Sequence, residues 1–278
     1  MEKRWIALSL ALLAARFAAA DSPPMTRQEL SYEVKAGERV RDLCARLEKQ
    51  GVFSTALFLR VASSEAFPSY PFVPPPRPAI DRFEGLFTPG AYLLSLPEAA
   101  GSLSAPEKLL VTRRIVSQLL SASSRRYRGL SPRHGLNLYA LATLASIVEK
   151  EAVVGRDDDK VASVFFNRMK AGMTLSSCPS VEYFLGYHRP YLTRADIAID
   201  SPYNTPIAFF SDGALKAVLD PAETPFEFFT FDWAAGRLYF ARDYAKHLLN
   251  TEQAQRNFIR MYGAQAMFRE YPGTFYAY

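Results

Sequence analysis

The fold of this chain is decided by residues 141–170, which read LATLASIVEKEAVVGRDDDKVASVFFNRMK. The first half of this stretch is apolar and predicts a helix, yet it carries two carboxylates, Glu149 and Glu151. Positions two apart on a helix point to different sides, so the two glutamates have different surroundings. Glu149 shares its side with small residues, whereas Glu151 follows the apolar stripe that packs on a core. That stripe is formed by Leu144, Ile147, Val148 and Val154.

A carboxyl group on the core-facing stripe loses hydration, and its pKa rises because burial disfavours the charged form. A raised pKa is what a general acid needs near neutral pH, so Glu151 is the candidate catalytic residue. The alternative is a structural role, in which Glu151 lies at the rim of the core and pairs with a lysine or an arginine.

The composition is that of a soluble protein with enough residues for a substantial core. The chain has 278 residues, of which 49% are hydrophobic and 22% charged, so it can form more than one domain. Within the formal net charge of +5, Lys3, Arg4 and Arg16 against Glu2 contribute +2, which leaves +3 for the remainder. So mild an excess does not indicate nucleic acid as a partner.

Residues 1–20 have the pattern of an export signal. A charged start precedes an apolar run, and three alanines at 18–20 end the segment. The apolar run is about 11 residues long, short of the roughly 20 that span a bilayer. An uncleaved anchor stays open, because residues 17–20 extend the run if Arg16 is tolerated. We therefore predict a signal peptide or membrane anchor at residues 1–20 and export of the rest.

The next part of the chain predicts a small lobe. Residues 30–34 alternate like a strand, residues 40–50 carry a helical apolar stripe, and Ser54 caps a second helix over residues 56–61. This order of strand, helix and helix looks like part of a LysM-type glycan-binding module, which we assign to residues 21–66.

Residues 67–135 are predicted to be a proline-rich linker and connecting segment, and residues 136–265 the main domain. The connecting segment is expected to hold an amphipathic helix at 106–123 and a basic loop at 124–135. In the main domain we expect helices at 137–154, from 156, at 179–185, 212–219 and 244–262, and a hairpin of residues 226–231 and 238–241. The predicted fold class is α+β, a small LysM-like β-α-α lobe followed by a mixed helix and β-hairpin domain.

Motifs for metal or nucleophile chemistry are missing from the sequence. The histidines His134, His188 and His247 form no HExxH motif, and Cys44 and Cys178 form no CxxC pair, so we expect no metal and no cofactor. A GxSxG elbow, a Walker loop and a GxGxxG motif are absent as well. A single carboxylic acid is the simplest catalyst left. The two cysteines could pair in an oxidising compartment or remain unpaired.

Several ordered motifs together resemble the endolytic murein transglycosylases of the YceG-like family. They are LASIVEKEA and KVASVFFNR within residues 144–168, SPYNT at 201–205, FEGLFTPGAY at 83–92 and the hairpin near 226–240. The similarity covers residues 30–65 and 83–250.

The resemblance implies a cell-wall enzyme whose catalytic residue is Glu151, the second glutamate of the family's IVEKE motif. Such an enzyme cuts peptidoglycan strands internally, between N-acetylmuramic acid and N-acetylglucosamine, and leaves 1,6-anhydro ends without a cofactor. It would terminate nascent strands on the periplasmic side of the inner membrane, with peripheral or single-span membrane contact. Its expected partners are peptidoglycan strands and cell-wall synthases.

Family motif positions also predict residues that hold sugar hydroxyl and acetamido groups. They are Asn167, Ser201, Tyr203, Asn204 and Thr205, and Tyr183 could stack on a sugar ring. Structural alternatives stay open: turn formation for residues 201–205, a cap or backbone bond for Asn167, and core packing for Tyr183. Arg168 could orient a carboxylate or pair with the aspartates at 157–159, and we favour a structural role for it.

Departures from the family pattern fall on the walls of the expected cleft. The Gly/Pro-rich loop after SPYNT is replaced by the shorter PIAFFSDGA, the DPT motif becomes Cys178-Pro179-Ser180, and GGHxF loses its histidine at residues 236–240. These changes favour a second hypothesis, a non-catalytic glycan-binding or synthase-scaffolding protein that keeps the fold. A third hypothesis, hydrolysis to reducing ends, would give products heavier by one water.

Overall fold

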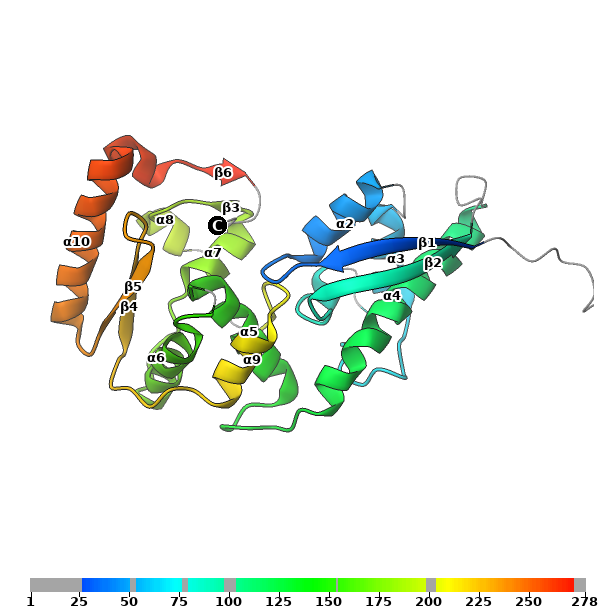
Figure 1. Cartoon of the computed structure of the whole chain (residues 1–278), viewed down its shortest axis with the longest axis horizontal. Coiled ribbons are helices and arrows are strands. Elements are labelled where there is room, and N and C mark those ends of the chain that lie inside the picture. Colours follow the sequence, from blue (N-terminus) through cyan, green and yellow to red (C-terminus); the bar gives the residue numbers. More distant parts are fainter. Residues whose placement is uncertain are drawn as a thin grey trace, which may run out of the picture.

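The computed structural model describes residues 27–50, 54–76, 80–97, 104–153, 155–198 and 204–272. Within these residues the fold is mixed α+β and mostly helical, with three two-stranded sheets, so the predicted class is confirmed. Figure 1 shows two lobes that lie next to each other and follow one another along the chain. In the described part of the chain, no helix combines the length and apolar character that a membrane crossing needs. The predicted export segment, residues 1–20, lies outside the described residues.

The first lobe is built on one antiparallel strand pair. Strand β1 (Arg27–Val34) pairs with β2 (Gly90–Pro97) over its full length. Between them come the helices α2 (Val40–Lys49) and α3 (Thr55–Ser64), which pack against each other beside the sheet (Figure 1). The predicted strand and both helices are confirmed. The second strand comes from the predicted connecting segment, so the pairing joins residues on both sides of the proline-rich stretch.

Local signals explain the start of these helices. The Arg39 backbone N–H donates to the Asp42 carboxylate, and the Ser54 hydroxyl accepts from the Leu57 N–H at 3.2 Å, as expected for helix caps. The apolar stripe of α2 is fully buried and consists of Val40, Leu43, Cys44 and Leu47. These caps and this stripe are both readable from the sequence, which is why the helices begin where they were predicted.

Helix α4 (Ala105–Arg128) is longer than predicted. Residues 124–128, expected to be loop, form its last turn. Tyr127 explains the difference, because its ring is buried and stacks on Phe72 with centroids 4.5 Å apart, while its hydroxyl donates to the Gly85 carbonyl. Tertiary packing of one aromatic residue therefore extends a helix that its basic composition made look like a loop.

The second lobe has a helical centre and a hairpin at its side. Helix α5 (Leu138–Glu151) packs on α6 (Asp158–Lys170) and α9 (Asp212–Leu219). The hairpin joins β4 (Phe228–Asp232) to β5 (Arg237–Ala241), with Asp232 opposite Arg237. All five elements are confirmed predictions, with boundaries shifted by a few residues.

The remaining elements close the lobe around the hairpin and α5. Helix α10 covers the outer face of the hairpin (Figure 1), and β3 pairs with β6 from the far end of the described chain. The sequence predicted α7 and α10, and Thr193-Arg194-Ala195-Asp196 resembles the capping box that starts α8, but the β3–β6 pair and η3 were not predicted. These elements are α7 (Cys178–Leu185), β3 (Tyr187–His188), α8 (Arg194–Ile197), α10 (Tyr244–Tyr262), η3 (Ala264–Phe268) and β6 (Tyr271–Pro272).

Helix α5 lies where the two lobes meet. Its residues 141–149 are all buried, and the buried apolar side chains of both lobes form one continuous core. Backbone bonds join the lobes directly: the Gly37 N–H donates to the Phe209 carbonyl at 2.7 Å, and the Phe209 N–H donates to Glu38 at 2.8 Å. Gly37 has a φ of +74°, a conformation that glycine adopts without strain. These bonds join the turn before α2 to the segment before α9, and Lys150 near the end of α5 donates from Nζ to the Gly37 carbonyl at 3.4 Å.

Candidate active site

Glu151 is the last residue of α5 and lines a cavity of about 470 Å³. The helix ends here because Ala152 turns to extended backbone, with a ψ of 153°. The Glu151 side chain is half-buried, so its carboxyl group is enclosed by protein and still open to the cavity. This is the placement that an acid acting on a bound molecule requires.

Two donors from the start of α7 contact the Glu151 carboxylate. The Ser177 hydroxyl and the Cys178 backbone N–H both hydrogen-bond to it. Burial is the largest influence on this group and raises the pKa of Glu151 to about 7, against the Ser177 bond, which lowers it. The negative charge of Glu182 also raises the pKa, while Arg168 and the Cys178 N–H lower it. A carboxyl group with a pKa near 7 is partly protonated at neutral pH and can give and take a proton.

Glu149 has a different environment, as predicted. It is buried, and its Oε2 accepts hydrogen bonds from the Ser211 backbone N–H at 2.9 Å and the Ser211 hydroxyl at 2.7 Å. Ser211 is the N-cap of α9, so this carboxylate fixes the start of that helix against α5. The contacts give Glu149 a structural role and leave Glu151 as the glutamate that faces the cavity.

Arg168 lines the cavity, and its guanidinium is hydrogen-bonded to backbone carbonyls. Its Nε donates to the Glu227 carbonyl at 2.6 Å and its Nη1 donates to the Leu175 carbonyl. Its guanidinium also lies 5.6 Å from the centre of the Phe228 ring. The favoured structural role agrees with these contacts. Its positive charge still lowers the pKa of Glu151, so it also influences the acid.

Aromatic side chains form a wall of the cavity that Glu151 lines. Trp233 is its largest member and contacts the ring of Phe231 edge-on, with centroids 5.1 Å apart. Sugar rings present C–H faces that pack on such surfaces. This wall was not predicted from the sequence, although the aromatic run FEFFTFDW at 226–233 is a signal for it. The aromatic lining residues are Tyr191, Phe228, Phe229, Phe231, Trp233 and Tyr244.

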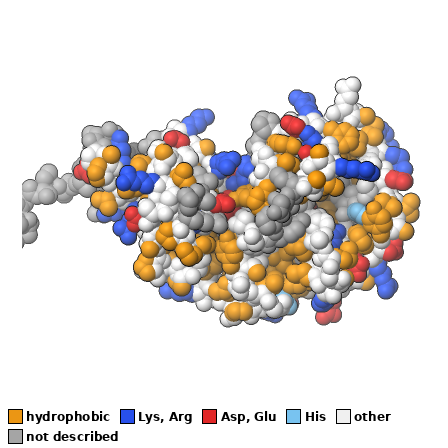
Figure 2. Space-filling view, turned by 180° about the vertical axis from the view of Figure 1, so that it is seen from behind, with side chains coloured by type: hydrophobic (Ala, Val, Ile, Leu, Met, Phe, Trp, Pro, Cys, Tyr) orange, Lys and Arg blue, Asp and Glu red, His pale blue; other side chains and the backbone are white. Residues whose placement is uncertain are grey.

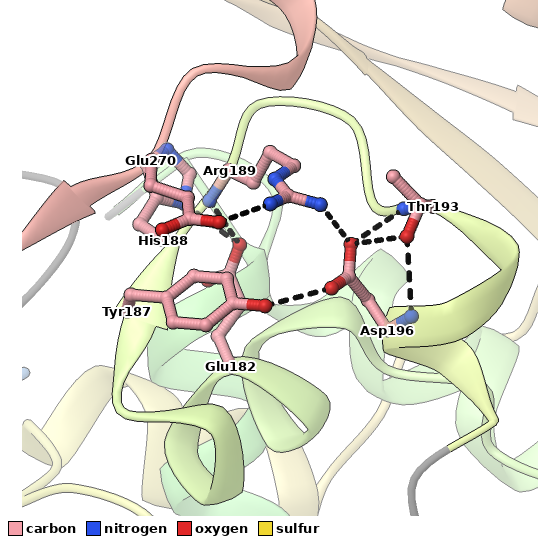
Figure 3. Close-up of polar contacts among 7 residues, drawn as sticks. All are labelled: Glu182, Tyr187, His188, Arg189, Thr193, Asp196 and Glu270. Carbon is pink, nitrogen blue, oxygen red and sulfur yellow. Dashed lines mark hydrogen bonds and ion pairs between the residues drawn. The ribbon is translucent and has the colours of Figure 1, made fainter.

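A polar network fixes the loop from α7 to α8 (Figure 3). His188 Nδ1 and Glu182 Oε1 lie 2.7 Å apart, both buried. Arg189 links Asp196, at 2.6 Å, to Glu270 near the end of the described chain. The loop held in this way contributes Pro190, Tyr191 and Leu192 to the cavity, so the network supports one of its walls.

The four predicted substrate-binding residues that the structure describes lie outside this cavity. Asn167 donates from Nδ2 to the Thr224 and Phe226 carbonyls at 2.8 and 2.9 Å, and the Tyr183 hydroxyl donates to Glu84 at 3.3 Å. Thr205 is buried and hydrogen-bonds with the Tyr139 hydroxyl at 3.2 Å. Asn204 lines a second cavity of about 410 Å³ beside the proline-rich segment.

None of these four described residues lines the cavity that contains Glu151. The other two, Ser201 and Tyr203, lie outside the described residues. Binding of substrate by any of the six stays a prediction.

The described residues offer neither a metal site nor a disulfide between the two cysteines. Among the described residues, no group of three or more His, Cys, Asp or Glu side chains is arranged to hold a metal ion. Cys44 and Cys178 are both free thiols, the first buried and the second exposed, so they do not pair with each other. On the face shown in Figure 2, basic and acidic side chains are interspersed among hydrophobic ones. Charge on that face therefore does not indicate a polyanionic partner.

Comparison with known proteins identifies the family of this chain. The model of the YceG-like family matches residues 10–253, so the chain belongs to that family. The endolytic murein transglycosylase of Bacillus subtilis (strain 168) is 33% identical over 130 residues, 44% of this chain and 36% of that protein. The protein of the same name from Streptococcus pneumoniae serotype 2 (strain D39 / NCTC 7466) is 26% identical over 212 residues, 68% of this chain and 36% of its own length.

These relatives are distant homologues, and the matched region spans about a third of their length, 36% in each case. The fold has a solved counterpart in the crystal structure of a yceG-like protein from Listeria monocytogenes. The two structures align with a TM-score of 0.63 at 23% identity, over 79% of this chain and 74% of the other. Membership of the family confirms the resemblance stated from the sequence.

Proposed function

We propose that this protein is a lytic transglycosylase that cleaves peptidoglycan strands between N-acetylmuramic acid and N-acetylglucosamine. The observation that carries the proposal is the Glu151 carboxyl group, with a pKa of about 7, in a cavity that has an aromatic wall. Among the described lining residues, Glu151 is the only carboxylate. A hydrolase of the common type needs two carboxylates, whereas a transglycosylase needs one.

In the proposed mechanism, protonated Glu151 donates its proton to the glycosidic oxygen as the bond to C1 of the muramic acid breaks. Positive charge develops at that carbon, and the leaving N-acetylglucosamine keeps the proton. The Ser177 hydroxyl and the Cys178 N–H stabilise the carboxylate that this step creates. The carboxylate then takes the proton of the C6 hydroxyl, whose oxygen bonds to C1 and closes the 1,6-anhydro ring. The acid is restored and no water is consumed.

The place of action is part of the proposal. Residues 1–20 would bring the protein to the periplasmic side of the inner membrane, by cleavage or by anchoring. There it would cut strands as cell-wall synthases extend them and so set where elongation ends. The export pattern of the sequence supports this location, and family membership supports peptidoglycan as the substrate.

The test is digestion of purified cell-wall sacculi followed by mass spectrometry of the released fragments. The expected products carry 1,6-anhydro-muramic ends, one water lighter than reducing ends. Glu151→Gln should release none, while Glu149→Gln, the same change two residues earlier, should keep activity per folded molecule.

Two other results would contradict the proposal. Reducing ends in place of anhydro ends would make the protein a hydrolase. Binding of sacculi without any release, over a range of pH, would favour the glycan-binding or scaffolding role. The missing family loop and hairpin histidine favour that second role.

A further inference from the structure

Three hydrogen-bonded polar side chains lie among the aromatic residues that line the Glu151 cavity. Thr230 on β4 lies at their centre, with Oγ1 3.2 Å from His247 Nδ1 and 3.0 Å from Thr251 Oγ1. His247 and Thr251 both belong to α10, one turn apart, and all three side chains line the cavity. The wall is therefore apolar with one polar cluster in it, and this cluster has no part in the mechanism above.

The imidazole of His247 is positioned by a ring contact and a hydrogen bond, and one of its two nitrogens can bind a ligand. Its ring stacks on Phe228, with centroids 5.2 Å apart and planes at 24°, and it is half-buried. Nδ1 is occupied by Thr230, and within the described part of the chain Nε2 has no hydrogen-bond partner. Burial, with Arg168 as the second cause, lowers the pKa of His247, so the ring is neutral at neutral pH.

These features point to a neutral polar ligand. The only basic side chain of the lining besides the neutral His247 is Arg168, whose guanidinium is already bonded to two carbonyls, so an anion has no free cation among the described lining residues. A ring nitrogen and two hydroxyls set among aromatic rings suit the hydroxyl or acetamido group of a sugar whose C–H face packs on the wall.

We propose that His247, Thr230 and Thr251 bind one N-acetylhexosamine of the glycan strand through its hydroxyl or acetamido groups. This inference rests on the proposed function, because it takes the ligand to be the same strand that Glu151 cuts. All three are then substrate-binding residues, and the Thr230 hydroxyl also links the His247 ring to the Thr251 hydroxyl.

The test uses the full chain carrying Glu151→Gln, which should bind glycan without cutting it. The chain has three histidines, so the imidazole Cε1–H signals in an NMR spectrum are few, and loss of one in His247→Gln assigns it. Addition of purified glycan strands freed of stem peptides should shift the His247 signal and leave that of His134 in place. His134 lies outside the cavity lining, with its Nε2 3.0 Å from the Leu219 carbonyl.

Affinity gives the second readout. Thr251→Val and His247→Gln should each weaken glycan binding roughly tenfold, the loss of about one hydrogen bond to a polar ligand. Thr251→Ser keeps the hydroxyl and His134→Gln lies elsewhere, so both should bind like the parent. Thermal melting of each variant shows that the fold is kept.

The outcomes separate this inference from the proposed activity. If glycan binds while the His247 signal stays unmoved and Thr251→Val binds like the parent, the subsite assignment is overturned and the chemistry at Glu151 is untouched. If glycan shifts His247 but the wild type releases no anhydro ends, the subsite stands and the proposed catalysis fails. Absence of any glycan binding would overturn the assignment itself.

Discussion

Replacement of Glu151 by Gln should stabilise the protein above neutral pH and leave its stability unchanged in acid. Burial raises the pKa of this carboxyl group from an ordinary 4.5 to about 7 in the folded protein. Below the unfolded-state pKa both states are protonated, and the wild type bears no penalty. As pH rises through the interval from 4.5 to about 7, the unfolded chain ionises more readily than the folded one, and wild-type stability falls.

The magnitude follows from the two pKa values. A rise from 4.5 to about 7 corresponds to about 3 kcal/mol in the free energy of unfolding once both states are ionised. Glu151 is half-buried, so solvent screens part of this effect, and we expect about 2 kcal/mol. The Gln carbonyl still accepts from Ser177 and Cys178, so few contacts are lost. In a chain of this size the gain should raise Tm by roughly 5 °C.

Urea denaturation of wild type and Glu151→Gln at about pH 4 and about pH 8 measures the difference directly. The two proteins should unfold alike in acid, and the variant should be more stable at the higher pH. Glu149→Gln serves as the matched control and should be less stable by about 1–2 kcal/mol at both, because it weakens the bonds to Ser211. An equal difference at both pH values, or a less stable Glu151→Gln at high pH, would refute the reasoning about burial.

Three further substitutions test the influences on the acid and the role of the wall. Glu182→Gln removes a negative charge that raises the pKa of Glu151, so the alkaline fall in kcat/KM should move to lower pH. Ser177→Ala removes a bond that lowers this pKa, so the same fall should move to higher pH; a shift of either variant in the direction opposite to the expected one would contradict the influence assigned to that residue. Trp233→Ala should raise KM for glycan about tenfold with a smaller change in kcat, measured as release of anhydro fragments, and an unchanged KM would exclude sugar packing on this ring.

The sequence predicted most helices because their signals are local. Asn137 and Ser211 cap the helices that follow them, and Gly186 ends α7 in the left-handed conformation. The β3–β6 pair was missed because it joins two residues to two others more than eighty positions away, and no local pattern marks so short a strand. Such pairing depends on the finished fold.

The candidate acid was found for a reason that is only partly right. Helical phase placed Glu151 on the core-facing stripe, yet α5 is buried on every side and Glu149 is the more buried of the two. What distinguishes them is position along the helix, because Glu151 is the terminal residue and opens onto the cavity. The Glu149 carboxylate is hydrogen-bonded by Ser211. This partner lies 62 residues further along the chain, so the local sequence does not predict the contact.

One of the family motifs altered in this chain touches the groups that set the pKa of Glu151, because Cys178 stands at the DPT position and its backbone N–H hydrogen-bonds to the carboxylate. Its surroundings combine burial and the Glu182 charge, which raise the pKa, with Ser177, Arg168 and the start of α7, which lower it. Backbone N–H groups at a helix start need no particular side chain, so Cys178 can replace the family's aspartate and still donate to the carboxylate. Because these groups remain in this chain, Glu151 can keep a pKa near 7 while other residues of the cavity lining are substituted. Differences in substrate preference from other family members should therefore map to β4 and α10, which contribute lining residues to the Glu151 cavity.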